Sequence, residues 1–235
     1  MTGILAIETA TDACSVAVFV DGQYQQRHEV IPRQHSQRLF GMLQELLPSG
    51  DLRAHGIEAI AYGCGPGSFT GLRIAASAVQ GLAYASGLPA VAVSSLACQV
   101  QTALRRGQVH SRDTVLSTID ARINEVYGAV YCFRQGLAVL QQGPWASAPA
   151  DIPVMNAQSL RAVGNGCRFL DKFPPAVRAV LQSSVKQLLP EARDLVPLAL
   201  EKLRCGDIQS PAQVQPVYVR NEISWKKLSQ QGKQS

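Results

Sequence analysis

A glycine-rich loop is the first feature that could do chemistry, and it reads Gly65-Pro-Gly-Ser-Phe-Thr-Gly71. It lies between an expected strand and an expected helix, where free backbone N–H groups and the helix dipole favour a bound anion. No Lys follows Gly71, as a P-loop requires, and the spacing misses the dinucleotide fingerprint. No acidic residue that could hold a ribose follows before Asp113. We therefore favour a tight strand-to-helix turn and keep a phosphate cradle as the alternative.

Side chains for nucleophilic or metal chemistry are few, and the chain has no Gly-x-Ser-x-Gly elbow. The four histidines lie outside any recognisable triad motif: His28, His35, His55 and His110. Leu39 follows His35 at the spacing where a helical metal pair needs a second histidine. Glu8, Asp12 and Asp120 are candidate acids flanking a cleft between two lobes, although facing carboxylates are common without chemistry. These residues by themselves predict no particular reaction.

The composition favours a globular protein of one large domain or two lobes. The chain has 235 residues, of which 46% are apolar and 17% charged, below the roughly 25% of an average globular protein. This excludes a disordered or fibrous chain. The six cysteines are scattered without metal-ligand spacing, which is typical of a reducing compartment. Neither a signal peptide nor an uninterrupted apolar run of membrane-spanning length is found, so we expect a cytoplasmic protein that binds no membrane.

Strands and helices alternate in the first half. Strands are expected at residues 4–7, 14–20, 23–30, 57–62 and 90–93. The turn Asp21-Gly22 joins the second of these strands to the third as a hairpin. One helix is expected around the apolar positions from Leu39 to Leu47. A second is expected from about residue 68 to 85, and a third from about 95 to 106.

The second half begins again with strands, expected at residues 115–119, 126–133 and 137–141. A Pro-rich excursion at 143–157, the turn Gly164-Asn-Gly166 and a helix from Asp194 to Arg204 follow. Two βββαβα-like halves result, with a seam near residues 107–113. This layout predicts an α/β, duplicated two-lobed, actin-like fold (ASKHA, the sugar kinase and Hsp70 type), each half a mixed sheet flanked by helices. We expect lobes at 1–106 and 107–214, with 215–235 packing back on the first.

Charged side chains are almost absent from residues 59–104, where Arg73 is the only one. The expected helix in this run carries small residues on several faces and lacks the Lys and Glu of a solvated helix. It should therefore be covered on more than one side. The cover is either its own domain or a partner protein, because interface cores are depleted in charge.

Six segments match one family, in the family's order, along residues 4–228. They are Ile4-Leu-Ala-Ile-Glu-Thr-Ala-Thr-Asp-Ala-Cys-Ser-Val-Ala17, Tyr62-Gly-Cys-Gly-Pro-Gly-Ser-Phe-Thr-Gly-Leu-Arg-Ile74, Gln80-Gly-Leu-Ala83, Ile119-Asp-Ala-Arg122 with Glu125-Val-Tyr127, Val163-Gly-Asn-Gly166, and Gln215-Pro-Val-Tyr-Val-Arg-Asn221 with Trp225-Lys-Lys-Leu228. With them the chain resembles the TsaB (YeaZ) family of bacterial tRNA threonylcarbamoyladenosine biosynthesis.

The resemblance implies an actin-like, non-catalytic scaffold that binds and activates the catalytic paralogue TsaD. In that pathway TsaC makes threonylcarbamoyl-adenylate from threonine, bicarbonate and ATP. Metal-bearing TsaD transfers the group to the adenosine next to the anticodon of tRNAs reading ANN codons. The ATPase TsaE joins the complex, and tRNA is reached through the complex. When alone, members of the family form homodimers through the first two long helices, residues 35–47 and 68–85 here.

The resemblance also implies where the sites lie. The partner and dimer interface is expected at His35, Leu39, Phe69, Leu72, Arg73, Ala76, Val79 and Gln80. A degenerate nucleotide site is expected at Glu8, Thr9, Ala10, Thr11, Gly164, Asn165 and Gly166. Glu8 stands where the family usually has Asp, and Ala10 adds a Cβ where a phosphate would approach. We therefore expect no catalytic residue, no metal and no cofactor of its own, with ATP or ADP bound weakly or at the interface with the partner.

Two other functions stay open. An ATPase or metallopeptidase-like enzyme of the same superfamily would need a metal site, or steady ATP turnover by the pure chain. A tRNA-binding module would use the basic end of the chain, within a net charge of +5. That end holds Arg220, Lys226, Lys227 and Lys233 against Glu222. Truncation after Asn221 would then abolish a steeply salt-dependent tRNA binding.

Overall fold

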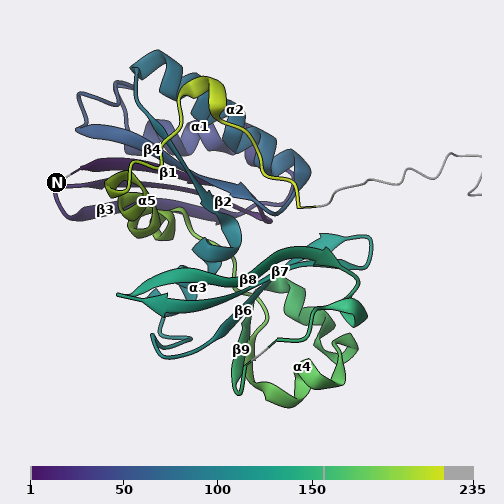
Figure 1. Ribbon diagram of the computed structural model, residues 1–235. Helices are drawn as coiled ribbons and strands as arrows, with labels where there is room; N and C mark the ends of the chain where they lie inside the picture. Colours follow the sequence, from purple (N-terminus) through teal and green to yellow (C-terminus); the bar gives the residue numbers. More distant parts are fainter. Residues whose placement is uncertain (1, 156, 220–235) are drawn as a thin grey trace, which may run out of the picture.

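The computed structural model describes residues 2–155 and 157–219, which form two lobes, each built on one five-stranded mixed sheet (Figure 1). The first sheet has the order β3-β2-β1-β4-β5. In it, β1 pairs antiparallel with β2 and parallel with β4. Its strands are Gly3–Glu8 (β1), Ala13–Val20 (β2), Gln23–Val30 (β3), Ile57–Gly65 (β4) and Ala90–Ser94 (β5).

The second sheet repeats the order and the strand directions of the first. Its order is β10-β9-β6-β7-β8, and β6 pairs antiparallel with β7 and parallel with β9. Its strands are Val115–Arg122 (β6), Glu125–Arg134 (β7), Leu137–Ser147 (β8), Leu160–Val163 (β9) and Leu181–Val185 (β10). The duplicated, two-lobed, actin-like architecture expected from the sequence is therefore confirmed.

Two long helices pack side by side on one face of the first sheet: α1 (His35–Leu46) and α2 (Phe69–Ser86). The Ser68 hydroxyl caps α2 by accepting the Gly71 N–H. The remaining α-helices of the described residues are α3 (Ser95–Arg105), α4 (Pro175–Val180) and α5 (Leu195–Arg204). Among the described residues, no helix is both long and apolar enough to cross a membrane.

The last helix of each lobe also packs on the other lobe. α3 follows the last strand of the first sheet and lies between the lobes in Figure 1, where it contacts β4 and β5 of the first sheet and β6, β7, β8 and β9 of the second. α5 follows the last strand of the second sheet but contacts β1, β4 and β5 of the first. One hydrophobic cluster consequently runs through both lobes, from Ile4 through Val100 and Leu195 to Val115. The second lobe expected at 107–214 thus includes a helix that packs on the first.

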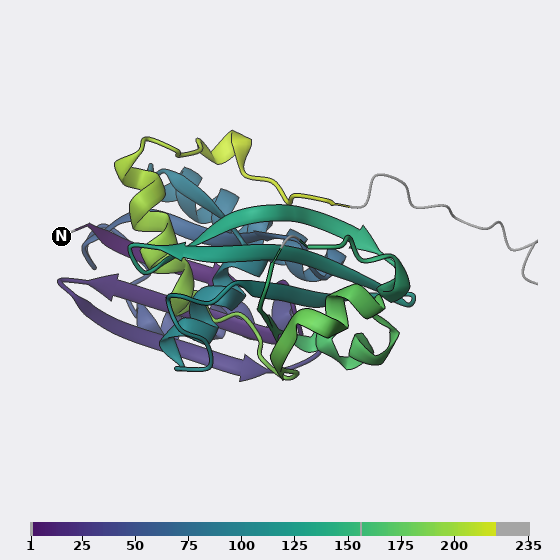
Figure 2. The same cartoon turned by 60° about the horizontal axis from the view of Figure 1, so that its bottom comes forward.

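The chain then continues along the first lobe after α5, as the yellow segment of Figure 2 shows. Gln209 pairs with Ala90 of β5, and the Val217 N–H donates to the Cys64 carbonyl over 2.8 Å. The return to the first lobe therefore begins with α5, earlier than the expected boundary at residue 215.

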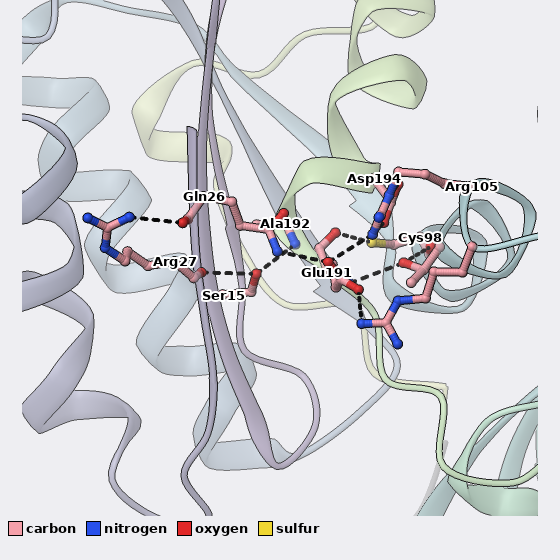
Figure 3. A network of polar contacts seen from close by, with 10 residues as sticks. Ser15, Gln26, Arg27, Cys98, Arg105, Glu191, Ala192 and Asp194 are labelled. Carbon is pink, nitrogen blue, oxygen red and sulfur yellow. Dashed lines mark hydrogen bonds and ion pairs between the residues drawn. The ribbon is translucent and has the colours of Figure 1, made fainter. Parts of the chain in front are cut away.

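A buried polar network fixes this return between β2, β3 and α3 (Figure 3). The carboxylates of Glu191 and Asp194 are 6% and 4% exposed, and Arg105 lies within 2.8 Å of the first and 2.7 Å of the second. Gln26 donates to Glu191 over 2.8 Å, and Ser15 accepts the Ala192 N–H over 3.0 Å. Burial opposes ionisation of Glu191, but Gln26 and the nearby arginines outweigh it and lower its pKa.

Replacing Arg105 with Leu is expected to lower the free energy of unfolding by about 2–3 kcal/mol, because two buried carboxylates lose a shared cation. In the variant Arg106 still pairs with Glu191, whereas Asp194 loses its only ion pair among the described residues, so most of the loss comes from Asp194. Urea unfolding of the purified chain measures it. Arg204→Leu, which removes an exposed pair with Glu201, is the control and should cost less than about 1 kcal/mol. Equal losses in the two variants would contradict the role given to the network.

Candidate functional site: a helical face and a filled cleft

The outer face of α2 carries almost no charge. The helix turns Leu72, Ala75, Val79 and Ala83 toward the first sheet, where all four are buried. Its exposed residues are Phe69, Thr70, Arg73, Ser77, Gln80, Gly81, Tyr84 and Ala85. The chain thus covers one side of this helix and leaves the other open, although that open side lacks the Lys and Glu of a solvated helix.

Large aromatic side chains stand on this face. Phe40 of α1 is 59% exposed, and Phe69 and Tyr84 of α2 are 49% and 80% exposed. A groove of about 500 Å³ lies between the helices, lined by Phe40, Phe69, Ser77 and other residues of α1 and α2. We call this surface the α1–α2 face. Aromatic residues around a hollow whose only charged lining residue is an arginine, Arg73, are typical of a protein-binding surface.

The expected interface residues divide between this face and the core. Phe69, Arg73 and Gln80 are exposed on α2. The structure buries the other five in the chain's own packing: His35, Leu39, Leu72, Ala76 and Val79. These five are therefore core positions of the free chain, and the exposed surface of α1 and α2 includes Phe40, Ser77 and Tyr84 instead. Because small residues lie on several sides of α2, the sequence pattern does not indicate which side of the helix faces the sheet.

The end of the described chain extends the α1–α2 face. The Tyr218 ring lies 5.6 Å from the Phe69 ring, centroid to centroid. The Arg73 guanidinium lies 3.9 Å from the Phe69 centroid, and its Nε donates to the Tyr218 hydroxyl over 3.2 Å. The single cation of α2 is thus engaged with aromatic rings of its own chain.

The first half of the expected nucleotide site is buried. Glu8, Thr9, Ala10 and Thr11, between β1 and β2, are each at most 5% exposed. One Glu8 oxygen accepts the Ala10 N–H over 2.6 Å, and the other accepts the Ser95 hydroxyl over 2.8 Å. Burial raises the pKa of Glu8 to about 7, against these hydrogen bonds, which act to lower it.

The glycine-rich loop packs directly on this turn. The Ser68 N–H donates to the Ala10 carbonyl over 2.7 Å, and the Thr9 hydroxyl donates to the Gly71 carbonyl over 2.8 Å. A Cβ on Gly67 or on Gly71 would collide with the backbone of the turn. The glycines therefore allow the backbones of the loop and the turn to approach closely, and the loop covers Ala10 of the turn. This supports the tight-turn interpretation of the loop.

The second half of the expected site is also packed against its own lobe. Gly164 has a φ of 105°, and a Cβ there would meet the Thr118 carbonyl. The Asn165 side chain accepts the Asp120 N–H over 2.8 Å. An ion pair of 3.1 Å between Arg122 and Asp12 links the two halves across the cleft. The expected residues of each half are thus packed or hydrogen-bonded within their own surroundings, and Asp12 and Arg122 make a contact between the two lobes.

Metal-binding groups are absent from the part of the chain that the structure describes, where no three His, Cys, Asp or Glu side chains gather. The ring of His35 is buried and its Nε2 lies 3.1 Å from the Ala13 carbonyl oxygen. Leu39, one turn further on, is fully buried. The basic residues proposed for tRNA binding, Arg220 and beyond, lie outside the described residues.

Comparisons with known proteins find one family model that matches part of the chain and relatives that match nearly all of it. Residues 25–140 match the family model described as "TsaD: tRNA N6-adenosine threonylcarbamoyltransferase". The tRNA threonylcarbamoyladenosine biosynthesis protein TsaB of Escherichia coli is 38% identical over 229 residues, 96% of this chain and 97% of that protein. TsaB of Haemophilus influenzae is 32% identical over 235 residues, 96% of each chain. A solved structure described as YeaZ from Pseudomonas aeruginosa is 37% identical, with a TM-score of 0.83, covering 93% of this chain and 100% of that one.

Proposed function

The chain belongs to the TsaB (YeaZ) family of tRNA threonylcarbamoyladenosine biosynthesis proteins, and we propose that it serves there as a docking partner, not as the group-transferring enzyme. The partner is the catalytic paralogue TsaD, which it binds and activates. TsaD then transfers threonylcarbamoyl to the adenosine next to the anticodon of tRNAs reading ANN codons. TsaE joins the complex, and tRNA binds to the complex in the cytoplasm.

The α1–α2 face carries this proposal. It combines a helix surface whose one charged residue is Arg73, a groove of about 500 Å³ and the exposed rings of Phe40, Phe69 and Tyr84. Burying such a surface against another apolar face stabilises a complex by removing aromatic area from water. A paralogue of the same fold can offer two helices in return, which gives a four-helix contact. A second copy of this chain can use the same face, so the homodimer and the complex with TsaD are mutually exclusive.

The buried β1–β2 turn supports a role without chemistry of its own. Ala10 of this turn lies beneath the glycine-rich loop, so a phosphate of ATP does not reach the Ala10 backbone without rearrangement. The carboxyl of Glu8 points to Ser95 of α3 rather than into an open site. We therefore place any ATP or ADP at the contact with the partner, and no metal or catalytic residue in this chain.

Reconstitution tests the proposal. TsaC, TsaD, TsaE, tRNA, threonine, bicarbonate and ATP are combined with or without the purified chain, and modified adenosine is quantified by mass spectrometry of digested tRNA. Modification is expected only when the chain is present, while the chain alone hydrolyses no ATP. Full modification without the chain, or steady ATP turnover by the chain alone, would contradict the proposal and favour the enzyme alternative.

A further inference from the structure

A backbone turn of unusual conformation projects from the second lobe. It joins β6 to β7 through Arg122, Ile123 and Asn124, whose φ angles are 63°, 51° and 57°. Three consecutive non-glycine residues in the left-handed region are strained, and a β-branched residue such as Ile123 tolerates that region worst. Ile123 is nevertheless 82% exposed, so burial of its own side chain does not compensate for the strain. A strained backbone persists only where its surroundings fix it.

Contacts from both lobes hold the turn in place. The Arg122 N–H donates to the Asp120 carboxylate over 2.9 Å, and the Arg122 guanidinium pairs with Asp12 of the first lobe. Asp120 in turn pairs with Arg168 over 3.0 Å and receives support from Asn165. The turn is thus held by contacts from both lobes and exposes the apolar side chain of Ile123.

The equivalent turn of the first lobe does not project. There, between β1 and β2, residues 8–11 are buried beneath the glycine-rich loop. The duplication has therefore diverged at this place, since one turn is packed away and the other presents Ile123 to solvent.

The turn continues the α1–α2 face. A hollow of about 520 Å³ is lined by Arg122 together with Ser36, Thr70 and Ile74. The last three residues also line the groove of the α1–α2 face, so the two hollows share a wall. Arg33 also lines the hollow of about 520 Å³, and it makes no ion pair within the described part of the chain.

We propose that the Arg122–Asn124 turn is a second contact point for TsaD, in which Ile123 enters an apolar recess and Arg33 and Arg122 face acidic side chains of the partner. This contact rests on the proposed function and extends it from one lobe to both. The partner would then touch the first lobe through α1 and α2 and the second lobe through the turn. Binding would be sensitive to how the two lobes are set relative to each other.

The variant Ile123→Asn tests the contact, because Asn tolerates the left-handed region and removes the apolar tip. We expect its Kd for TsaD to rise at least ~10-fold, while the Tm of the free chain rises by ~2 °C as strain is relieved. Ile208→Ser is the control, since Ile208 is 48% exposed next to Gln209, at the opposite end of the first sheet. Its Kd should stay within about two-fold of the parent value.

The outcomes separate this contact from the proposed function. A Kd of Ile123→Asn within two-fold of the parent overturns the contact, whatever happens to the Tm. If only the homodimer is weakened, the second copy is the occupant and the contact with TsaD is wrong. If the parent chain does not bind TsaD, the proposed function fails and the contact with it. If the parent binds and Ser77→Glu on α2 abolishes binding while Ile123→Asn does not, only the contact is wrong.

Discussion

Replacing Ser77 with Glu is expected to weaken binding to TsaD by at least ~100-fold, about 2.7 kcal/mol, and to abolish tRNA modification in the reconstituted system. Ser77 is exposed at the middle of α2 and lines the groove beside Phe40 and Phe69. A carboxylate there would lose its hydration on complex formation, and Arg73, the one cation of α2, is already stacked on Phe69, so any pairing with it offsets only part of that cost. The homodimer should be lost in the same variant.

The fold of this variant should be unchanged, because Glu is a good helix former and the position faces solvent in the free chain. Isothermal titration with TsaD measures the binding, and thermal unfolding checks the fold. Ala179→Glu is the matched control, as it places the same carboxylate on the exposed side of α4 in the second lobe. A Kd for Ser77→Glu within about three-fold of the control would remove the α1–α2 face from the interface.

Replacing Glu8 with Gln is expected to change how stability depends on pH. Burial raises the pKa of Glu8 from an ordinary 4.5 to about 7, so the folded chain holds a proton that the unfolded chain has released. Between these two pKa values the folded state binds more protons, and stability falls as the pH rises. The fall is complete near pH 7 and amounts to about 3 kcal/mol for a shift of this size. Gln cannot ionise, so this fall should be absent in the variant.

Urea unfolding at pH 5 and pH 8 measures the effect as a difference between variant and parent. The free energy of unfolding of Glu8→Gln, relative to the parent, should rise by about 2–3 kcal/mol between the two pH values. Glu58→Gln, an exposed carboxylate on β4, controls for the loss of one negative charge. A parent and a Glu8→Gln variant with parallel pH dependence would show that Glu8 is ionised normally in the folded chain.

Much of the first lobe could be predicted from local sequence. The Asp21-Gly22 turn fixed the β2–β3 hairpin, and Ser68 capped α2 where a Ser between a loop and an apolar run indicates a helix start. The nearly uncharged run at residues 59–104 predicted a helix whose surface lacks Lys and Glu, and the exposed side of α2 has this composition. Which residues of α2 face outward was not predictable, because Ala and Gly occupy several sides and give no periodic signal.

The second lobe was harder to predict for two physical reasons. β8 continues to Ser147 through Gly143 and Pro144, residues that usually end a strand, because an edge strand tolerates a missing N–H. β10, with the sequence Leu-Gln-Ser-Ser-Val, mixes polar and apolar residues and was not expected. α3 and α5 each pack on strands of the other lobe as well. Local sequence does not predict this packing, because either amphipathic helix could cover either sheet.

Hydrogen exchange of the chain with and without saturating TsaD tests the central claim most directly. The account predicts slower amide exchange in peptides from α1 and α2, residues 35–46 and 69–86, and unchanged exchange in α4 at residues 175–180. The same slowing, without TsaD, should appear at chain concentrations where the homodimer forms. Unchanged exchange in α1 and α2 at saturating TsaD, with slowing confined to the second lobe, would contradict the assignment of the docking surface.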